Sequence, residues 1–183
     1  MTKFILLRHG QTDWNLNGLY QGQSDIPLNE TGIRQAEAVA DELKDVPFDI
    51  VYCSDLIRAV LTAEKAISKH AEVPVVLDKR LRERHFGSFE GAVYARDAMD
   101  PAIAAEMQQN PLTFRFPGGE SLQDVEARAR EVYAEILEKH PEQTVLIVSH
   151  GAFLSVFASL VAGEPLENRK RFIFNNAEPL FLL

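Results

Sequence analysis

Four residues that suit phosphate chemistry follow short apolar segments of the chain. Arg8 and His9 come directly after the apolar run at 3–7, and His150 closely follows the run at 144–148. Arg58 comes soon after a third run, at 49–53. The planar guanidinium of arginine matches phosphoryl oxygens with paired donors. A neutral imidazole can attack phosphorus, and a second imidazole can stabilise the charge that develops on the oxygens. These residues therefore predict a phosphate pocket with a histidine nucleophile.

A phosphate ester also needs an acid, because the leaving alkoxide must be protonated. Glu83 lies in the segment LRERHFG, after a predicted strand at 73–77. It is the first candidate for this acid. Glu90 and Asp78 are alternatives that the sequence leaves open.

The elements that must position these residues are segments with the two-residue repeat of a strand, which alternate along the chain with segments that have the 3.6-residue repeat of a helix. Strands are predicted at 3–7, 49–53, 73–77 and 144–148, with edge strands at 172–174 and 179–183. Helices are predicted at 31–44, 56–69, 121–139 and 151–162, the third with a capping box made by Ser121 and Asp124. The inward residues are expected to be Ile33, Ala36, Ala40 and Leu43 in the first helix, and Ile57, Val60, Leu61 and Ile67 in the second.

This alternation predicts an α/β fold: a three-layer sandwich with a mostly parallel central sheet flanked by helices. Ligands of such sheets bind beyond the carboxyl ends of the strands, where the polar residues named above should converge. The segment 80–116 is expected to be an insertion-like region on the substrate side, with one short helix near 103–109. With no repeat or linker, residues 1–183 are expected to form a single domain.

Composition narrows the class of protein. The net charge of −8 disfavours nucleic acid and anionic membranes as partners, but a local arginine cluster still allows a small phosphorylated substrate. No apolar run approaches the ~18 to 20 residues that span a bilayer, and the N-terminus does not resemble a signal peptide. The single cysteine fits a cytoplasmic protein. The apolar C-terminal segment could pair within the chain or across a homodimer.

Other phosphate and metal chemistries fit the sequence poorly. Cys53 and Arg58 form C-x4-R, one residue short of the cysteine phosphatase loop and without its glycines, so Cys53 is expected to be a small buried strand residue. No HExxH or local ligand pair indicates zinc, and arginines beside the histidines would repel a dication. No Walker loop or GxGxxG is present, so no cofactor is expected.

Six blocks of sequence resemble the histidine phosphatase superfamily, also called phosphoglycerate mutase-like proteins. They are LLRHGQTDWN with PLNETGIRQA, CSDLIRAVLTA, LRERHFGSFEG, FPGGESL and VSHG, in that order along most of the chain. The resemblance implies that His9 is the phosphorylated nucleophile and Glu83 the proton donor, with Arg8, Arg58 and His150 completing the phosphate pocket. It also implies that Asn15 binds the phosphoryl group, that Thr12, Gln21 and Gly22 lie near the substrate, and that no metal is needed.

The branch of the family decides the reaction. ERHFG is close to the ERHYG of the cofactor-dependent phosphoglycerate mutases. The chain departs from them elsewhere, because it has only Arg96 and Arg115 between Gly91 and Gly118 and lacks a Gly-Asn pair after His150. FPGGES resembles the shorter phosphatases, so hydrolysis of small phosphate esters is expected. A phosphoglycerate mutase and a non-catalytic phosphohistidine carrier remain alternatives, and the substrate is open.

Overall fold

The computed structural model describes residues 1–94 and 99–182, and in this part of the chain five strands form one sheet. They are β1 (Lys3–Arg8), β2 (Ile50–Cys53), β3 (Val75–Leu77), β4 (Thr144–Ser149) and β5 (Pro179–Leu182). Their order is β3-β2-β4-β1-β5. All neighbours are parallel except β1 and β5, which are antiparallel. The mostly parallel sheet expected from the sequence is confirmed.

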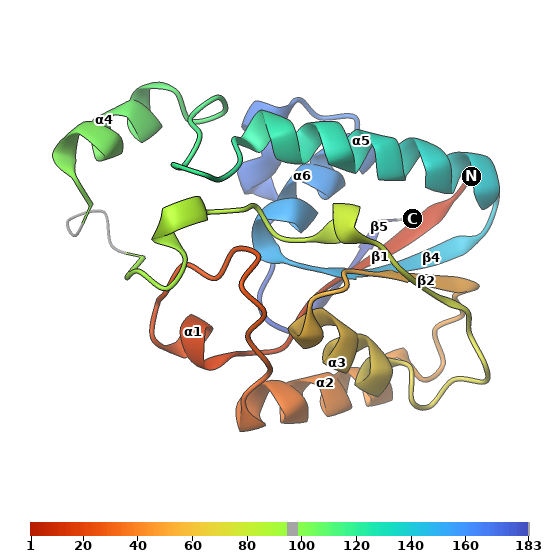
Figure 1. Cartoon of the computed structure of the whole chain (residues 1–183). Coiled ribbons are helices and arrows are strands. Elements are labelled where there is room, and N and C mark those ends of the chain that lie inside the picture. Colours follow the sequence, from red (N-terminus) through yellow and green to blue (C-terminus); the bar gives the residue numbers. More distant parts are fainter. Residues whose placement is uncertain (95–98, 183) are drawn as a thin grey trace.

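Alternating side chains of the central strands face two helical layers. Phe4 and Leu6 of β1 pack toward α5 (Leu122–Lys139) and α6 (Gly151–Val161). Ile5 and Leu7 pack toward α2 (Glu30–Leu43) and α3 (Ile57–Ala66). Figure 1 shows α5 and α6 on one side of the sheet and α2 and α3 on the other. Because the central strands are apolar on both faces, the sheet is stable only when both faces are covered.

Shorter helices lie in the connections. They are α1 (Asp13–Leu16), α4 (Pro101–Gln109) and the 3-10 turns η1 (Lys79–Leu81), η2 (Gly87–Phe89) and η4 (Leu166–Arg171). The segment 80–116 contains α4, as expected, and Figure 1 shows this helix set apart from the sheet layers. Its apolar residues form a small cluster of their own with Tyr20, Met99, Phe114 and Phe116. That residues 1–183 are one domain stays a prediction.

The predicted inward face of α3 is confirmed only in part, since Val60 and Ile67 pack against the core but neither is fully buried. Ile57, Val60, Leu61 and Ile67 are only partly buried, and the buried face consists of Arg58, Ala59, Thr62, Ala63 and Ala66. Small residues let α3 approach α2 and the sheet closely, and this face also carries a buried arginine. In α2, Ile33 is likewise exposed, whereas Gly32 and Val39 join Ala36, Ala40 and Leu43 in the buried face.

The strand predicted at 172–174 is wrong, because this segment pairs with no strand. It instead provides a backbone carbonyl that binds the Arg8 side chain. The backbone carbonyl of Phe174 accepts a hydrogen bond from Arg8 Nη1 at 2.8 Å, and the Phe174 ring is buried in the core. The predicted strand at 179–183 is present as β5, which pairs with β1 of the same chain; Leu183 itself lies outside the described residues.

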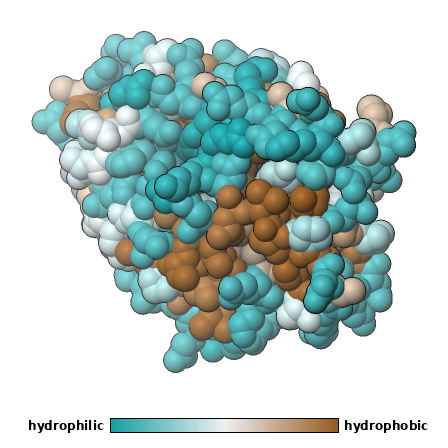
Figure 2. Space-filling view, turned by 45° about the vertical axis from the view of Figure 1, so that its right-hand side comes forward, coloured by the Kyte–Doolittle hydropathy of each residue, from teal (hydrophilic) through white to brown (hydrophobic). Residues whose placement is uncertain are grey.

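The surface is mostly hydrophilic, but Figure 2 shows a hydrophobic patch on one face. Large exposed apolar side chains include those of the edge strand β3, Val75, Val76 and Leu77. Within the described residues, no helix combines the length and apolar character needed to cross a membrane.

Candidate active site

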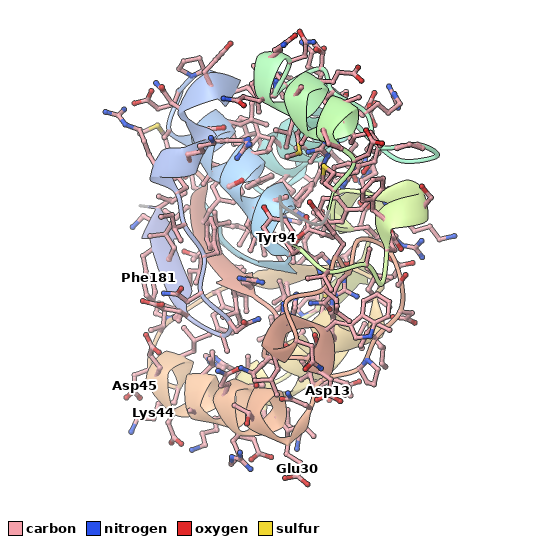
Figure 3. All side chains as sticks on the ribbon, turned by 90° about the vertical axis from the view of Figure 1, so that its left-hand side faces the viewer. Asp13, Glu30, Lys44, Asp45, Tyr94 and Phe181 are labelled. Carbon is pink, nitrogen blue, oxygen red and sulfur yellow. The ribbon has the colours of Figure 1, made fainter. Side chains whose placement is uncertain are left out.

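A cavity of about 110 Å³ lies at the carboxyl end of β1, where Arg8 and His9 line it, and Arg58 reaches it from α3, the helix that follows β2. Figure 3 looks onto this end of the sheet, with Tyr94 near the centre of the view. Seven of the nine predicted site residues line the cavity: Arg8, His9, Asn15, Gln21, Gly22, Arg58 and Glu83. Leu19, Tyr20, Phe86 and Tyr94 complete its wall. Thr12 and His150 lie just behind the lining.

His9 is set for nucleophilic attack. Its ring Nδ1 lies 2.7 Å from the Gly10 carbonyl oxygen, which can only accept, so Nδ1 carries the proton and Nε2 keeps its lone pair. Burial holds the pKa of His9 well below the usual 6.5, and the nearby Arg58 and Arg8 lower it further. The imidazole is therefore neutral and nucleophilic at physiological pH.

His150 ends the path of β4 and stands beside His9, with the two ring centroids 5.2 Å apart. Its Nε2 lies 2.8 Å from the Ser54 hydroxyl, and its buried Nδ1 has no partner within the described residues. Burial lowers the pKa of His150 far below 6.5, followed by the effect of Arg58. Without a bound anion, both histidines are thus held neutral.

The two arginines are held by backbone carbonyls. Arg58 donates from Nη1 to the Ser24 carbonyl and from Nη2 to the Gly22 carbonyl, both at 2.7 Å. Arg8 donates from Nη1 to Phe174. Burial lowers the pKa of Arg58 to about 10, which still leaves this group cationic at neutral pH. Burial also lowers the pKa of Arg8.

Unpartnered buried polar atoms gather at this cavity. Six buried side-chain nitrogen or oxygen atoms lack a hydrogen-bond partner within the described residues, and four belong to predicted site residues: Arg8 Nε, Gln21 Oε1, Arg58 Nε and His150 Nδ1. Buried polar groups are nearly always hydrogen-bonded, so such a concentration indicates a place for a ligand. The two guanidinium nitrogens suit an anion.

Glu83 is the carboxyl group that faces the cavity. Its Oε2 accepts from the Ala152 amide at 3.1 Å, and its Oε1 accepts from the Phe153 amide at 3.2 Å, both at the N-terminus of α6. Arg128 of α5 fixes the supporting loop, donating from Nη1 to the Arg80 and Arg82 carbonyls and from Nη2 to that of Glu83. The loop therefore has little freedom to move away from the cavity.

The two alternative acids have other tasks. Glu90 binds the backbone amides of Gln23 and Ser24 at 2.9 Å, and so orders the loop that holds Arg58. Asp78 pairs with Arg80. Neither lines the cavity.

Thr12 is fully buried and caps α1, where its hydroxyl and amide bond with Asn15. Thr12 therefore positions Asn15, which itself lines the cavity. The aromatic residues Tyr20 and Phe86 line the cavity, whereas Trp14 and Phe89 do not. Cys53 is a buried strand residue whose thiol pKa is raised by burial, so it is no nucleophile.

Sequence reasoning missed Asn176. Its Nδ2 donates to the His9 carbonyl at 2.9 Å and to Asn15 Oδ1 at 3.3 Å, which ties the nucleophile's backbone to the segment before β5. A polar pair, Asn175 and Asn176, directly before an apolar terminal strand was the available signal. Arg128 was missed as well, because its role depends on how α5 packs against the loop that carries Glu83.

The described residues include no cluster of three or more His, Cys, Asp or Glu side chains able to hold a metal ion. The cationic arginines and the neutral histidines instead favour an anionic group.

Known proteins resemble this chain in sequence and in overall fold. Glucosyl-3-phosphoglycerate phosphatase of Mycobacterium tuberculosis is 34% identical over 174 residues, which cover 91% of this chain and 78% of that protein. Metal-independent phosphoserine phosphatase of Arabidopsis thaliana is 37% identical over 158 residues, covering 84% and 66%. The crystal structure of the alpha-ribazole phosphatase from Shigella flexneri superposes with a TM-score of 0.88 at 32% identity, covering 98% of this chain and 89% of that one.

The sequence model of the histidine phosphatase superfamily (branch 1) matches residues 4–180. The match includes Arg8, His9, Arg58 and His150. Together with the shared fold, it shows that the chain belongs to the histidine phosphatase superfamily.

Proposed function

We propose that this protein is a metal-independent phosphomonoesterase that hydrolyses small phosphate esters through a phosphohistidine at His9. The observation that carries the proposal is the neutral His9, with its Nε2 free, beside three buried nitrogens that have no partner within the described residues: Arg8 Nε, Arg58 Nε and His150 Nδ1. A phosphoryl group supplies the oxygen acceptors that these nitrogens lack.

In the first step, His9 Nε2 forms a bond to phosphorus while the bond from phosphorus to the ester oxygen breaks. The electron pair leaves on that oxygen, and Glu83 protonates it to release the alcohol. Arg8 and Arg58 bind the phosphoryl oxygens, and His150 stabilises the charge that spreads over them in the transition state.

In the second step, water attacks phosphorus and Glu83 takes a proton from it. The Nε2–P bond breaks, its electron pair returns to the imidazole, and inorganic phosphate leaves. The same carboxyl group thus acts first as acid and then as base, and the protein returns to its starting state.

The test compares wild type with His9→Ala on an aryl phosphate in excess EDTA. Metal-independent phosphate release is expected from wild type, with a loss of at least about 10³-fold in the variant because it has no nucleophile. His70→Ala, outside the cavity, is the control. Full activity of His9→Ala would contradict the proposal.

Trapping the intermediate adds a second measurement. Rapid mixing with labelled ester and quenching in alkali, where phosphohistidine persists, should give labelled wild-type protein and unlabelled His9→Ala. Isomerisation of a phosphoglycerate without phosphate release would instead show a mutase. A stable phosphoprotein that never hydrolyses would show the carrier function.

The small phosphorylated substrate, the lack of nucleic-acid or membrane partners and the homodimer stay predictions. The cytoplasmic location is likewise proposed, on the grounds of a single cysteine that is buried and unpaired.

A further inference from the structure

A second cavity adjoins the phosphate cavity. It has a volume of about 440 Å³, and Tyr20 and Tyr94 line both cavities, with their ring centroids 4.5 Å apart. The remaining lining residues are Arg84, Met107, Gln108, Pro111, Leu122, Arg169 and Lys170. The two tyrosines are therefore a wall that both cavities share, and the buried Tyr20 is part of it.

The second cavity is cationic and has no acid in its described lining. Arg84, Arg169 and Lys170 contribute positive charge, and no Asp or Glu stands among the described residues that line it. This contrasts with other arginines of the chain, since Arg82 and Arg130 each pair with a carboxylate at 2.6 Å. In a chain of net charge −8, such a local excess of positive charge requires a reason.

Arg169 has no counterion in the described part of the chain. Its guanidinium makes no hydrogen bond or ion pair there, and its buried Nε is one of the two unpartnered atoms that lie outside the phosphate site. Burial lowers the pKa of Arg169. A half-buried cation without a partner is costly, so this arrangement is stabilised when an anion binds.

Arg84 stands close to Arg169. Its guanidinium lies 4.8 Å above the Phe116 ring, and it donates from Nε and Nη2 to the carbonyls of Glu120 and Phe114. After burial, repulsion from Arg169 is the next cause that lowers the pKa of Arg84. The two cations line the same cavity and repel each other, and an anion bound between them would reduce this repulsion.

We propose that this second cavity binds a further anionic group of the substrate, a carboxylate or a second phosphoryl group, through Arg169 with support from Arg84 and Lys170. The protein would then select phosphate esters that carry a second negative charge over esters that carry a neutral group. This inference rests on the phosphatase activity proposed above, since it assigns the remainder of that substrate.

The test uses three small esters that differ in one group. Glycerol 3-phosphate ends in a neutral alcohol, 3-phosphoglycerate in a carboxylate, and glycerol 1,3-bisphosphate in a second phosphoryl group. The kcat/KM of each is measured for wild type, Arg169→Gln, Lys170→Ala and Arg171→Ala. Arg171 is the matched control, because it belongs to the same η4 segment but pairs with Glu164 at 2.7 Å and lines neither cavity.

Wild type is expected to prefer at least one of the two doubly anionic esters to glycerol 3-phosphate. Arg169→Gln should reduce that preference about 10- to 100-fold, the value of one or two charge-assisted hydrogen bonds, chiefly through KM. Lys170→Ala should reduce it less, because Lys170 is exposed, and Arg171→Ala should not change it. Whichever ester shows the effect identifies the carboxylate or the second phosphoryl group.

The outcomes separate the two proposals. If wild type hydrolyses all three esters at similar efficiency, or if Arg169→Gln leaves the preference intact, the anion subsite is wrong and the phosphatase stands. If wild type hydrolyses none of the esters and no aryl phosphate, both proposals are wrong. Thermal melting checks the folding of Arg169→Gln, and the exposed Lys170→Ala provides an independent result should that variant unfold.

Discussion

At the scale of single residues, the position of Glu83 makes its role measurable. Its carboxyl group lies in the phosphate cavity at the start of α6, whereas Glu90 orders a neighbouring loop. A proton donor matters most when the leaving group is a poor one. The identity of the leaving group therefore distinguishes a general acid from a residue that only supports the site.

Glu83→Gln should lower kcat about 10²- to 10⁴-fold for an alkyl phosphate, whose alkoxide must be protonated as it leaves. The loss should be much smaller in the first step for a nitrophenyl phosphate, whose phenolate leaves unaided. Single-turnover kinetics on the two esters measure this step directly. The control, Glu90→Gln, should slow both esters to a similar degree, and an equal loss for both esters in Glu83→Gln would argue against a proton donor.

The types and spacing of the residues were enough to predict most of the cavity lining, because each histidine and arginine follows a strand and parallel strands end at one edge. Asn176 and Arg169 were not predictable in this way. The asparagine pair marks a position before β5, but Asn176 reaches His9 only because β5 returns antiparallel to β1. Arg169 lines the second cavity only because η4 packs there, which no local pattern encodes.

At the scale of elements, a glycine contact joins α2 to the loop that carries His9. A Cβ on Gly32 would lie 2.0 Å from the Gln11 carbonyl oxygen, and one on Gly10 would lie 2.5 Å from the Gly32 oxygen. Both oxygens belong to the backbone, so neither can avoid the contact by a change of side-chain rotamer. The first turn of α2 is therefore packed directly against the nucleophile loop, although α2 contributes no residue to the cavity lining.

Gly32→Ala should accordingly lower kcat/KM by at least about tenfold and lower the free energy of unfolding by about 1 to 3 kcal/mol, despite the better helix propensity of alanine. Chemical denaturation and aryl phosphate kinetics measure the two effects. Ala38→Gly, on the exposed face of α2, is the reciprocal control. It should cost about 1 kcal/mol of stability and leave kcat/KM unchanged. Wild-type kinetics in Gly32→Ala would show that the loop tolerates displacement.

The spacing of apolar residues predicted the long helices, which bury one face, and the central strands, which are buried on both faces. It predicted the inward face of α3 only in part, because the bulky apolar residues that define a stripe are half-exposed there and the buried face carries Arg58 and Thr62. The site imposed that exception: Arg58 binds carbonyls at the cavity, and the Thr62 hydroxyl accepts from the Gly10 amide at 3.0 Å. The spacing of apolar residues cannot predict which polar side chains are buried because the site requires them.

At the scale of the whole molecule, the two buried histidines connect the site to stability. Both His9 and His150 have a folded-state pKa far below 6.5, because burial and the neighbouring arginines disfavour their charged forms. The unfolded chain takes up protons near pH 6.5 and the folded chain does not. Unfolding is therefore favoured by acid in this range, and stability rises with pH until both states are neutral.

The free energy of unfolding should be flat above about pH 7 and should fall below pH 6.5, by up to about 1.4 kcal/mol per pH unit for each histidine. Urea titrations between pH 7.5 and pH 5.5 measure the slope. His9→Gln should remove roughly half of it. A slope that is absent in wild type, or unchanged in His9→Gln, would show that the histidines are not held neutral.

The sheet order also has a consequence for the order in which the molecule is assembled. Among residues 1–94 and 99–182, β1 (Lys3–Arg8) pairs only with β4 (Thr144–Ser149) and β5 (Pro179–Leu182). While the ribosome synthesises the chain, the first strand has no partner until more than a hundred residues have followed it. His9 is therefore synthesised well before the residues that surround it in the fold, since Asn176 follows it by 167 positions and His150 also lies far along the chain. A chain that has not yet been synthesised past Asn176 cannot hold the histidine in its reactive setting, so catalytic competence requires that part of the chain.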